Sequence, residues 1–233
     1  MKTGLQTAFF SLAVFLVCQP VLAGPYEDAA AAYIRRNYTE ALELWLPLAE
    51  QGNAAAQFNL GAMHENGQGV PRDNAKAEMW YKLAAGLGLA DAQFTLGVRY
   101  ETGQGVLQNT AEALKWYRLA ADQGFTQAQY NLGVIYDNAS GVRRDLAEAA
   151  KWYLAASEKG LAAAQAKLGL MHETGRGVRL DYAEAATWYQ RAADQGDASA
   201  QGHLGAMYDK GRGVAQDFAK ALKWYRLAAD QGD

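Results

Sequence analysis

Few side chains in this sequence are placed to act as catalytic nucleophiles. Beyond residue 23 the chain has three serines, Ser140, Ser157 and Ser199, and no cysteine, because the only cysteine is Cys18. A serine that forms an acyl-enzyme in the manner of penicillin-binding proteins has a lysine three residues later, one helical turn away. None of the three serines is followed by lysine at that spacing. Residues 24–233 therefore offer no disulfide, no thiolate metal ligand and no recognisable acyl-enzyme serine.

The three histidines do not predict a metal site. His64 and His172 occupy a recurring position that tyrosine fills elsewhere, so an aromatic-sized packing role is the simpler interpretation and a ligand role is the alternative. They lie three repeats apart, too far to share a metal ion. His203 stands at a variable position that we expect to be exposed. Gly-x-Gly motifs can cradle phosphate, but here they recur without a preceding strand and fit loops after helices. We predict no cofactor and no metal.

The elements that would carry these residues repeat every 36 residues. Leu-Gly and Trp-Tyr pairs both recur with that step and without an insertion. Five units result, at 53–88, 89–124, 125–160, 161–196 and 197–232. A fixed period of this length is typical of a solenoid of helix pairs rather than a globular enzyme. The recurring residues assigned to the structural core are Leu60, Gly61, Leu96, Gly97, Leu132, Gly133, Leu168, Gly169, Leu204, Gly205, Trp80, Trp116, Trp152, Trp188 and Trp224.

Each unit contains the signals for two helices. In the second copy Ala92 and Leu96 share one helical face, and Gly97 is expected to let a neighbouring helix approach closely. A Gly-x-Gly-Val loop then ends the first helix; the third copy has Ala139 instead of the first glycine, and we expect Asn138 to take the left-handed conformation there. The tryptophan is the expected buried anchor of the second helix. The expected N-caps of the second helices are Asp73, Asn109, Asp145, Asp181 and Asp217.

The two ends of the sequence differ from the five units. Residues 1–23 combine Lys2, an apolar run and small residues before Ala23, which predicts a secretory signal peptide cleaved after Ala23. Residues 24–52 predict a degenerate helix pair that caps the N-terminal end of the solenoid. No polar helix follows the fifth unit, so its apolar face is expected either to stay exposed or to mediate binding of a partner or a homodimer.

Charge and length exclude several classes of function. Residues 24–233 carry 21 basic and 25 acidic side chains (22 minus Lys2, against 25), a net charge of −4. This balance provides no electrostatic surface for nucleic acid. The apolar run near the N-terminus is shorter than the roughly 20 residues of a membrane-spanning helix, so no stable membrane insertion is expected after signal cleavage.

The repeat as a whole resembles a known family. The pattern A-x-A-Q-x-x-L-G-x-x-Y-x-x-G-x-G-V-x-x-D-x-x-x-A-x-x-W-Y-x-x-A-A-x-x-G, which covers residues 53–232, closely resembles the Sel1-like repeat (SLR) family, relatives of the tetratricopeptide repeats. The resemblance implies a right-handed α/α solenoid that acts as an adaptor in protein complexes, often secreted or periplasmic in bacteria. One cysteine-rich secreted branch is credited with binding and hydrolysing β-lactams, but this chain lacks the paired cysteines of that branch.

The resemblance also places two rows of side chains on the first helices, which line the concave groove of tetratricopeptide repeats. The aromatic row, Phe58, Phe94 and Tyr130, is expected to anchor a partner there or, alternatively, to contact the adjacent repeat. The second row is acidic in all five copies and is expected either to attract a basic segment or to pair internally with Lys115, Arg118 or Arg226. Its members are Glu65, Glu101, Asp137, Glu173 and Asp209.

Taken together, these patterns predict a non-catalytic scaffold, secreted or periplasmic, that binds a partner protein or an extended peptide in its groove. A hydrolase directed at β-lactams or the cell wall is an alternative, and so is a structural solenoid that assembles with itself. The identity of the partner does not follow from the sequence.

Overall fold

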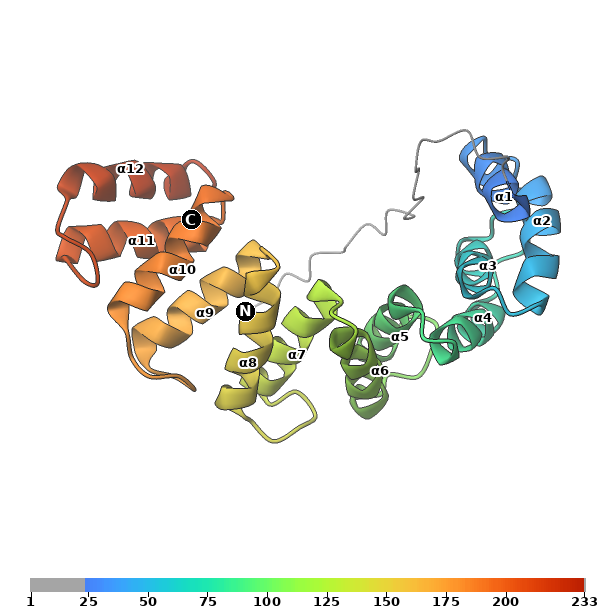
Figure 1. Ribbon diagram of the computed structural model, residues 1–233, viewed down its shortest axis with the longest axis horizontal. Coiled ribbons are helices and arrows are strands. Elements are labelled where there is room, and N and C mark those ends of the chain that lie inside the picture. Colours follow the sequence, from blue (N-terminus) through green and yellow to red (C-terminus); the bar gives the residue numbers. More distant parts are fainter. Residues whose placement is uncertain (1–23, 233) are drawn as a thin grey trace.

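The computed structural model describes residues 24–232, which fold into twelve α-helices and contain no strand. Consecutive helices form antiparallel pairs, and the pairs follow one another along an arc (Figure 1). The chain is thus an all-α solenoid, as its period predicts. The helices are α1 (Pro25–Ile34), α2 (Tyr38–Glu50), α3 (Ala54–Asn66), α4 (Asn74–Gly86), α5 (Ala90–Thr102), α6 (Thr110–Asp122), α7 (Thr126–Asn138), α8 (Leu146–Glu158), α9 (Ala162–Thr174), α10 (Tyr182–Asp194), α11 (Ala198–Lys210) and α12 (Phe218–Ala229).

Local sequence signals set the boundaries of these helices. The five predicted N-caps accept hydrogen bonds from backbone N–H groups of the first turn; Asp181 Oδ1, for example, accepts from Ala183 and Glu184 at 3.0 Å each. First helices end at a left-handed glycine such as Gly103, with φ 76°. In the third unit Ala139 itself adopts this conformation, with φ 57°, so our expectation for Asn138 was wrong. Asn138 remains the last residue of α7.

The glycine of each Leu-Gly pair explains how the two helices of a unit meet. A Cβ atom on Gly97 would lie 2.5 Å from the ring of Tyr117 on the second helix, closer than real side chains approach. The same tyrosine ring covers the glycine in all five units, so the missing side chain at Gly61, Gly133, Gly169 and Gly205 makes room for Tyr81, Tyr153, Tyr189 and Tyr225. The close approach predicted for Gly97 is therefore made by an aromatic ring of the same unit.

In the first four units the tyrosine is the more deeply buried member of the Trp-Tyr pair, whereas in the fifth unit Trp224 is 7% exposed and Tyr225 is 39% exposed. Tyr117 is completely buried, whereas Trp116 is half-buried and carries Lys115 over its ring. Our assignment of the tryptophans as main anchors was therefore wrong for Trp80 and Trp116, because the tyrosine points at the first helix and the tryptophan toward its edge. Trp152, Trp188 and Trp224 are buried but retain 5–7% exposure.

The pair α1 and α2 continues the array at its N-terminal end. Trp45 of α2 occupies the repeat position of Tyr81 and is completely buried against the rings of Tyr26 and Tyr33. None of the helices in residues 24–232 is both long and apolar enough to cross a membrane. The signal peptide that we predict for residues 1–23 lies outside the described residues.

Candidate interaction surface

The first helices of the pairs form the inner side of the arc. Each packs against its own second helix and against the second helix of the preceding pair, and α9 also touches α11 directly. One recurring position of these helices is aliphatic and half-buried, and Val98, Leu170 and Val134 at this position pack against the core clusters. We take this position as the candidate floor of a groove. The floor residues are Ala62, Val98, Val134, Leu170 and Ala206.

First helices approach one another directly in the second half of the molecule, where α9 contacts α11. Tyr130 on the preceding first helix, α7, is half-buried, and burial raises the pKa of its hydroxyl.

The aromatic row does not line this groove as a set. Phe58, Phe94 and Tyr130 pack on the buried tyrosine of their own unit, with ring centroids 5.4, 5.7 and 5.8 Å apart. Phe94 also stacks on Phe125 of the next unit at 4.9 Å and is only 6% exposed. The prediction that Phe94 anchors a partner is therefore wrong, and contact with the adjacent repeat, the alternative, describes it. Phe58 and Tyr130 keep partial exposure.

The acidic row accepts hydrogen bonds from the buried tyrosines. The hydroxyl groups of Tyr81, Tyr117 and Tyr189 donate to Glu65, Glu101 and Glu173 at 2.7, 2.5 and 2.8 Å. Burial, with the adjacent carboxylate, raises the pKa of each of these three tyrosines, which keeps the hydroxyl protonated as a donor. In this way three acids of the row connect the ends of α3, α5 and α9 to the second helix of the same unit.

Several acids of the row also bind a group from the next unit. Glu65 forms an ion pair with Arg99, Asp137 with Arg176 at 3.0 Å, and Glu173 with His203 at 3.0 Å. The internal partners are thus first-helix or loop residues, and the prediction of Lys115, Arg118 or Arg226 was wrong. Lys115 and Arg118 instead pair with Glu112 and Glu148.

Not every acid of the row has an ion pair. Within residues 24–232 neither Glu101 nor Asp209 forms one, although a further unit follows Glu101. The acids with partners are largely occupied internally, which leaves them little capacity to attract a basic segment of another protein.

Two of the cross-unit partners differ sharply in exposure. Arg99 is 2% exposed, at a position that Met63, Ile135, Met171 and Met207 fill in the other units, and its Nε and Nη2 atoms have no hydrogen-bond partner. The side chain of His203 is 37% exposed and stacks on the ring of Tyr189 at 4.8 Å. The side chain of His203 is thus exposed to solvent, as expected, and its ring also contributes to the junction between two units.

Sequence reasoning did not interpret the glutamine of the repeat pattern, which forms a second connection between units. Each of these glutamines is 4–6% exposed and donates Nε2 to a carbonyl at the end of the preceding second helix, as Gln93 does to Ala85 at 3.1 Å. The recurrence of glutamine at the same position of a buried helix face could have indicated this connection. The glutamines are Gln57, Gln93, Gln129, Gln165 and Gln201.

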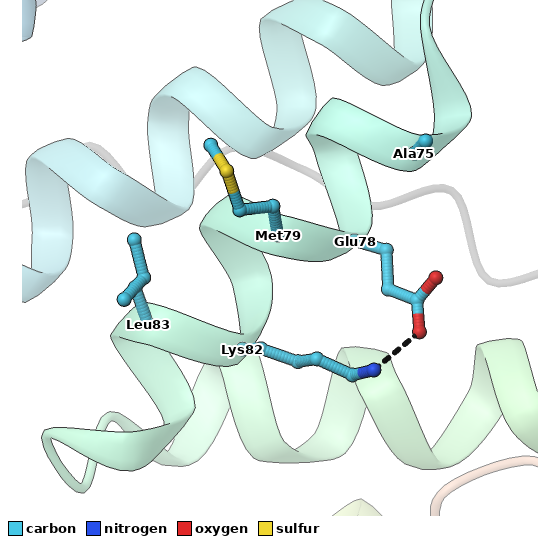
Figure 2. Close-up of a pocket in the computed structure, with 5 residues that line it drawn as sticks. All are labelled: Ala75, Glu78, Met79, Lys82 and Leu83. Carbon is cyan, nitrogen blue, oxygen red and sulfur yellow. Dashed lines mark ion pairs between the residues drawn. The ribbon is translucent and has the colours of Figure 1, made fainter.

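The outer side of the solenoid offers only shallow hollows. Figure 2 shows one on α4, where Met79 and Leu83 project on one side and the ion pair between Glu78 and Lys82, 2.7 Å long, lies on the other. Met79 and Leu83 are about half exposed. Among residues 24–232 no three histidine, cysteine or acidic side chains come close enough together to hold a metal ion.

A family model for the Sel1 repeat matches the chain six times, at residues 24–53, 54–89, 90–125, 126–161, 162–197 and 198–233. The chain belongs to the Sel1 repeat family. The model includes the first pair, α1 and α2, as a sixth repeat. Sel1 repeats mediate protein–protein interactions, and the internal connections described above explain how such a repeat stacks.

Solved structures and curated proteins agree with this assignment. A protective antigen of uropathogenic Escherichia coli with an SLR fold is 40% identical, with a TM-score of 0.83 over 90% of this chain and 46% of its own. A Sel1 repeat protein of Oxalobacter formigenes is 36% identical, with a TM-score of 0.84 over 89% of this chain and 86% of its own. A 46-residue stretch is 46% identical to HRD3A of Arabidopsis thaliana, an ERAD-associated E3 ubiquitin-protein ligase component, but covers 7% of that protein.

Proposed function

We propose that this Sel1 repeat protein is a non-catalytic scaffold that binds a partner protein or an extended peptide along the inner side of its arc. The observation that carries the proposal is the direct contact between α9 and α11, which brings first helices of successive units together on one side of the array. The aliphatic floor along this face supplies apolar contact area for a ligand. HRD3A is named as a component of a larger ligase, which is consistent with an adaptor role for Sel1 repeats.

We propose that this scaffold acts outside the cytoplasm, in the periplasm or secreted, and the predicted signal peptide supports this proposal. The groove should recognise apolar side chains, because the acids that border it are engaged by tyrosines and by cross-unit partners. Apolar contacts in a groove supply most of the binding free energy, and the surrounding polar groups set orientation. The chemistry of the site thus favours an extended segment with apolar side chains over a strongly basic one.

The experiment is a pull-down with the chain immobilised, compared with two variants of equal charge. The groove variant carries Val98→Glu and Val134→Glu on the floor, and the control carries Leu83→Glu and Leu119→Glu on the outer side. Circular dichroism first establishes that both variants fold. We expect the control to retain the proteins captured by the unchanged chain and the groove variant to lose them. Equal capture by both variants would place the binding surface elsewhere.

A further inference from the structure

The loops that join the two helices of the third, fourth and fifth units are positively charged, although the protein as a whole is acidic. Residues 139–145, 175–181 and 211–217 contain five arginines, no lysine and three aspartates, a net charge of +2, whereas residues 24–233 carry −4. The corresponding loops of the first two units, 67–73 and 103–109, have no net charge. The positive charge is thus confined to one half of the molecule. The five arginines are Arg143, Arg144, Arg176, Arg179 and Arg212.

These three loops form a continuous edge, which we call the arginine edge. In Figure 1 they follow one another along the lower left margin of the arc. A Cβ atom on Gly177 would collide with the backbone of Leu146, the first residue of α8, and one on Gly213 would collide with the backbone of Tyr182, the first residue of α10. The guanidinium of Arg212 also lies over the ring of Tyr182, 5.8 Å from its centroid. Each loop therefore rests on the residues that directly follow the preceding loop.

The arginines of this edge outnumber the acids that pair with them. Asp137 is shared by two of them, Arg144 at 3.5 Å and Arg176 at 3.0 Å. The other three, Arg143, Arg179 and Arg212, are exposed and form no ion pair in the part of the chain that the structure describes. Three guanidinium groups on three successive loops are therefore available to a ligand.

The aspartates of the same loops are used by the helices that follow. Asp145, Asp181 and Asp217 each accept a backbone N–H of the next first turn, at 2.9 to 3.0 Å. These bonds lower the pKa of Asp181 and Asp217, which keeps both carboxylates ionised as caps. The aspartates thus fulfil a local role, whereas like charges gathered on neighbouring loops oppose folding. The excess of arginine is better explained by binding than by stability.

A hollow of about 690 Å³ lies beside two of the arginines. Arg143 and Arg144 contribute the positive charge of its wall, and the other residues that line it are Tyr136, Val142, Asp145 and Leu146. A ligand at this position can therefore place a carboxylate on a guanidinium and an apolar side chain beside it.

We propose that the arginine edge binds an extended acidic segment of a partner protein, at a site separate from the floor of the groove. A guanidinium binds a carboxylate through two parallel hydrogen bonds, and clusters of arginine are a recurrent means of recognising acidic motifs. Arg143 and Arg179 occupy equivalent positions of successive loops, so a segment that follows the edge meets them in turn. A flat anionic membrane fits less well, because the loops follow the margin of an arc and the net charge of the protein is negative.

Fluorescence anisotropy with a labelled peptide of repeated Glu-Val-Ser units tests the proposal, and a Gln-Val-Ser peptide is the uncharged comparison. We expect the chain to bind the glutamate peptide, to bind it more weakly as salt is added, and not to bind the glutamine peptide. Arg143→Gln combined with Arg179→Gln should weaken binding of the glutamate peptide about tenfold or more, because two charge-assisted contacts are lost.

The matched control combines Arg72→Gln with Arg226→Gln. Both residues are exposed, have no ion pair within the described residues 24–232 and lie outside the arginine edge, so this variant loses the same charge. Circular dichroism establishes that both variants fold, and the control should bind the glutamate peptide as the unchanged chain does. Equal weakening in both variants, similar binding of the two peptides, or binding of neither would overturn the proposal. So would binding to phosphatidylglycerol vesicles without binding to the glutamate peptide, since the arginines would then serve a membrane surface.

Discussion

The repeats at 53–88 and 161–196 place the same acid and the same tyrosine at their inner edge, but they join the following repeat differently. Glu65 binds Tyr81 and the buried Arg99, whereas Glu173 binds Tyr189 and the partly exposed His203. Arg99 occupies a core position, whose equivalent in the later repeat is Met207. These two repeats thus share the acid–tyrosine bond, while the cross-unit partner differs and determines how strongly each junction depends on charge.

Substitution of the acid should destabilise the protein by very different amounts in these two repeats. Glu65→Gln leaves the guanidinium of Arg99 buried without its counter-ion, and breaking a buried pair in this way costs about 3–5 kcal/mol. Glu173→Gln should cost less than about 1 kcal/mol, because the side chain of His203 is 37% exposed and can be solvated. Urea unfolding followed by circular dichroism measures both. Equal losses of unfolding free energy in Glu65→Gln and Glu173→Gln would show that the burial of Arg99 has no energetic consequence.

The shared element should respond equally in both repeats. Gly61→Ala and Gly169→Ala place a Cβ atom 2.7 and 2.8 Å from the rings of Tyr81 and Tyr189. Overpacking of this kind costs about 1–3 kcal/mol, which outweighs the gain in helix propensity. The control is Gly86→Ala, because no atom lies within 4 Å of its Cβ position, and this change should not destabilise the protein. A much larger effect in one repeat than in the other would mean that the packing is not equivalent.

Removing Arg99 should have a smaller effect than removing its partner. Arg99→Met introduces the residue found at the equivalent position in three other units, and it removes a buried charge with two unsatisfied nitrogen atoms. Glu65 keeps the Tyr81 hydroxyl and Gln104, and its side chain is 17% exposed. Replacing a buried charge with a well-packed apolar residue is often neutral or stabilising, so the unfolding free energy should change by less than about 1.5 kcal/mol. If Arg99→Met lowered the unfolding free energy as much as Glu65→Gln does, the expected difference between removing the base and removing the acid would be contradicted.

The sequence predicted the helix pairs, their caps and the stacking of units, because these follow from a period and from signals within a few residues. It did not predict which of two adjacent aromatic residues is buried. Which of the two is buried depends on how the second helix is rotated about its axis relative to Gly97. The structure shows this rotation, because the ring of Tyr117 lies over this glycine. A glycine fixed at one helical position in every unit was the usable sign that a large ring covers it.

The candidate surface was harder to predict than the fold. The acids recur, but their cross-unit partners lie at three different repeat positions: a core position for Arg99, a loop for Arg176 and an inner-face position for His203. The row therefore appeared free in the sequence, because the residue types of its partners change from unit to unit: the loop position that supplies Arg176 to Asp137 supplies Gln104 to Glu65. The burial of Phe94 escaped notice for a similar reason, since its stacking partner Phe125 has an aromatic side chain in only this unit among the five.

The glutamine connection gives the last and smallest difference between the two repeats. In the repeat at 161–196, Gln195 donates to Gln165 at 2.8 Å, so the buried glutamine is fully used. In the repeat at 53–88 the equivalent residue is the exposed Leu87, and Oε1 of Gln57 is buried without a partner. Leu87→Gln should stabilise the protein by about 0.5–1.5 kcal/mol in urea unfolding, by supplying that donor, and Gln195→Leu should destabilise it by a similar amount. If Leu119→Gln, which also replaces an exposed leucine, raised stability as much as Leu87→Gln, the gain would come from surface polarity and not from Gln57.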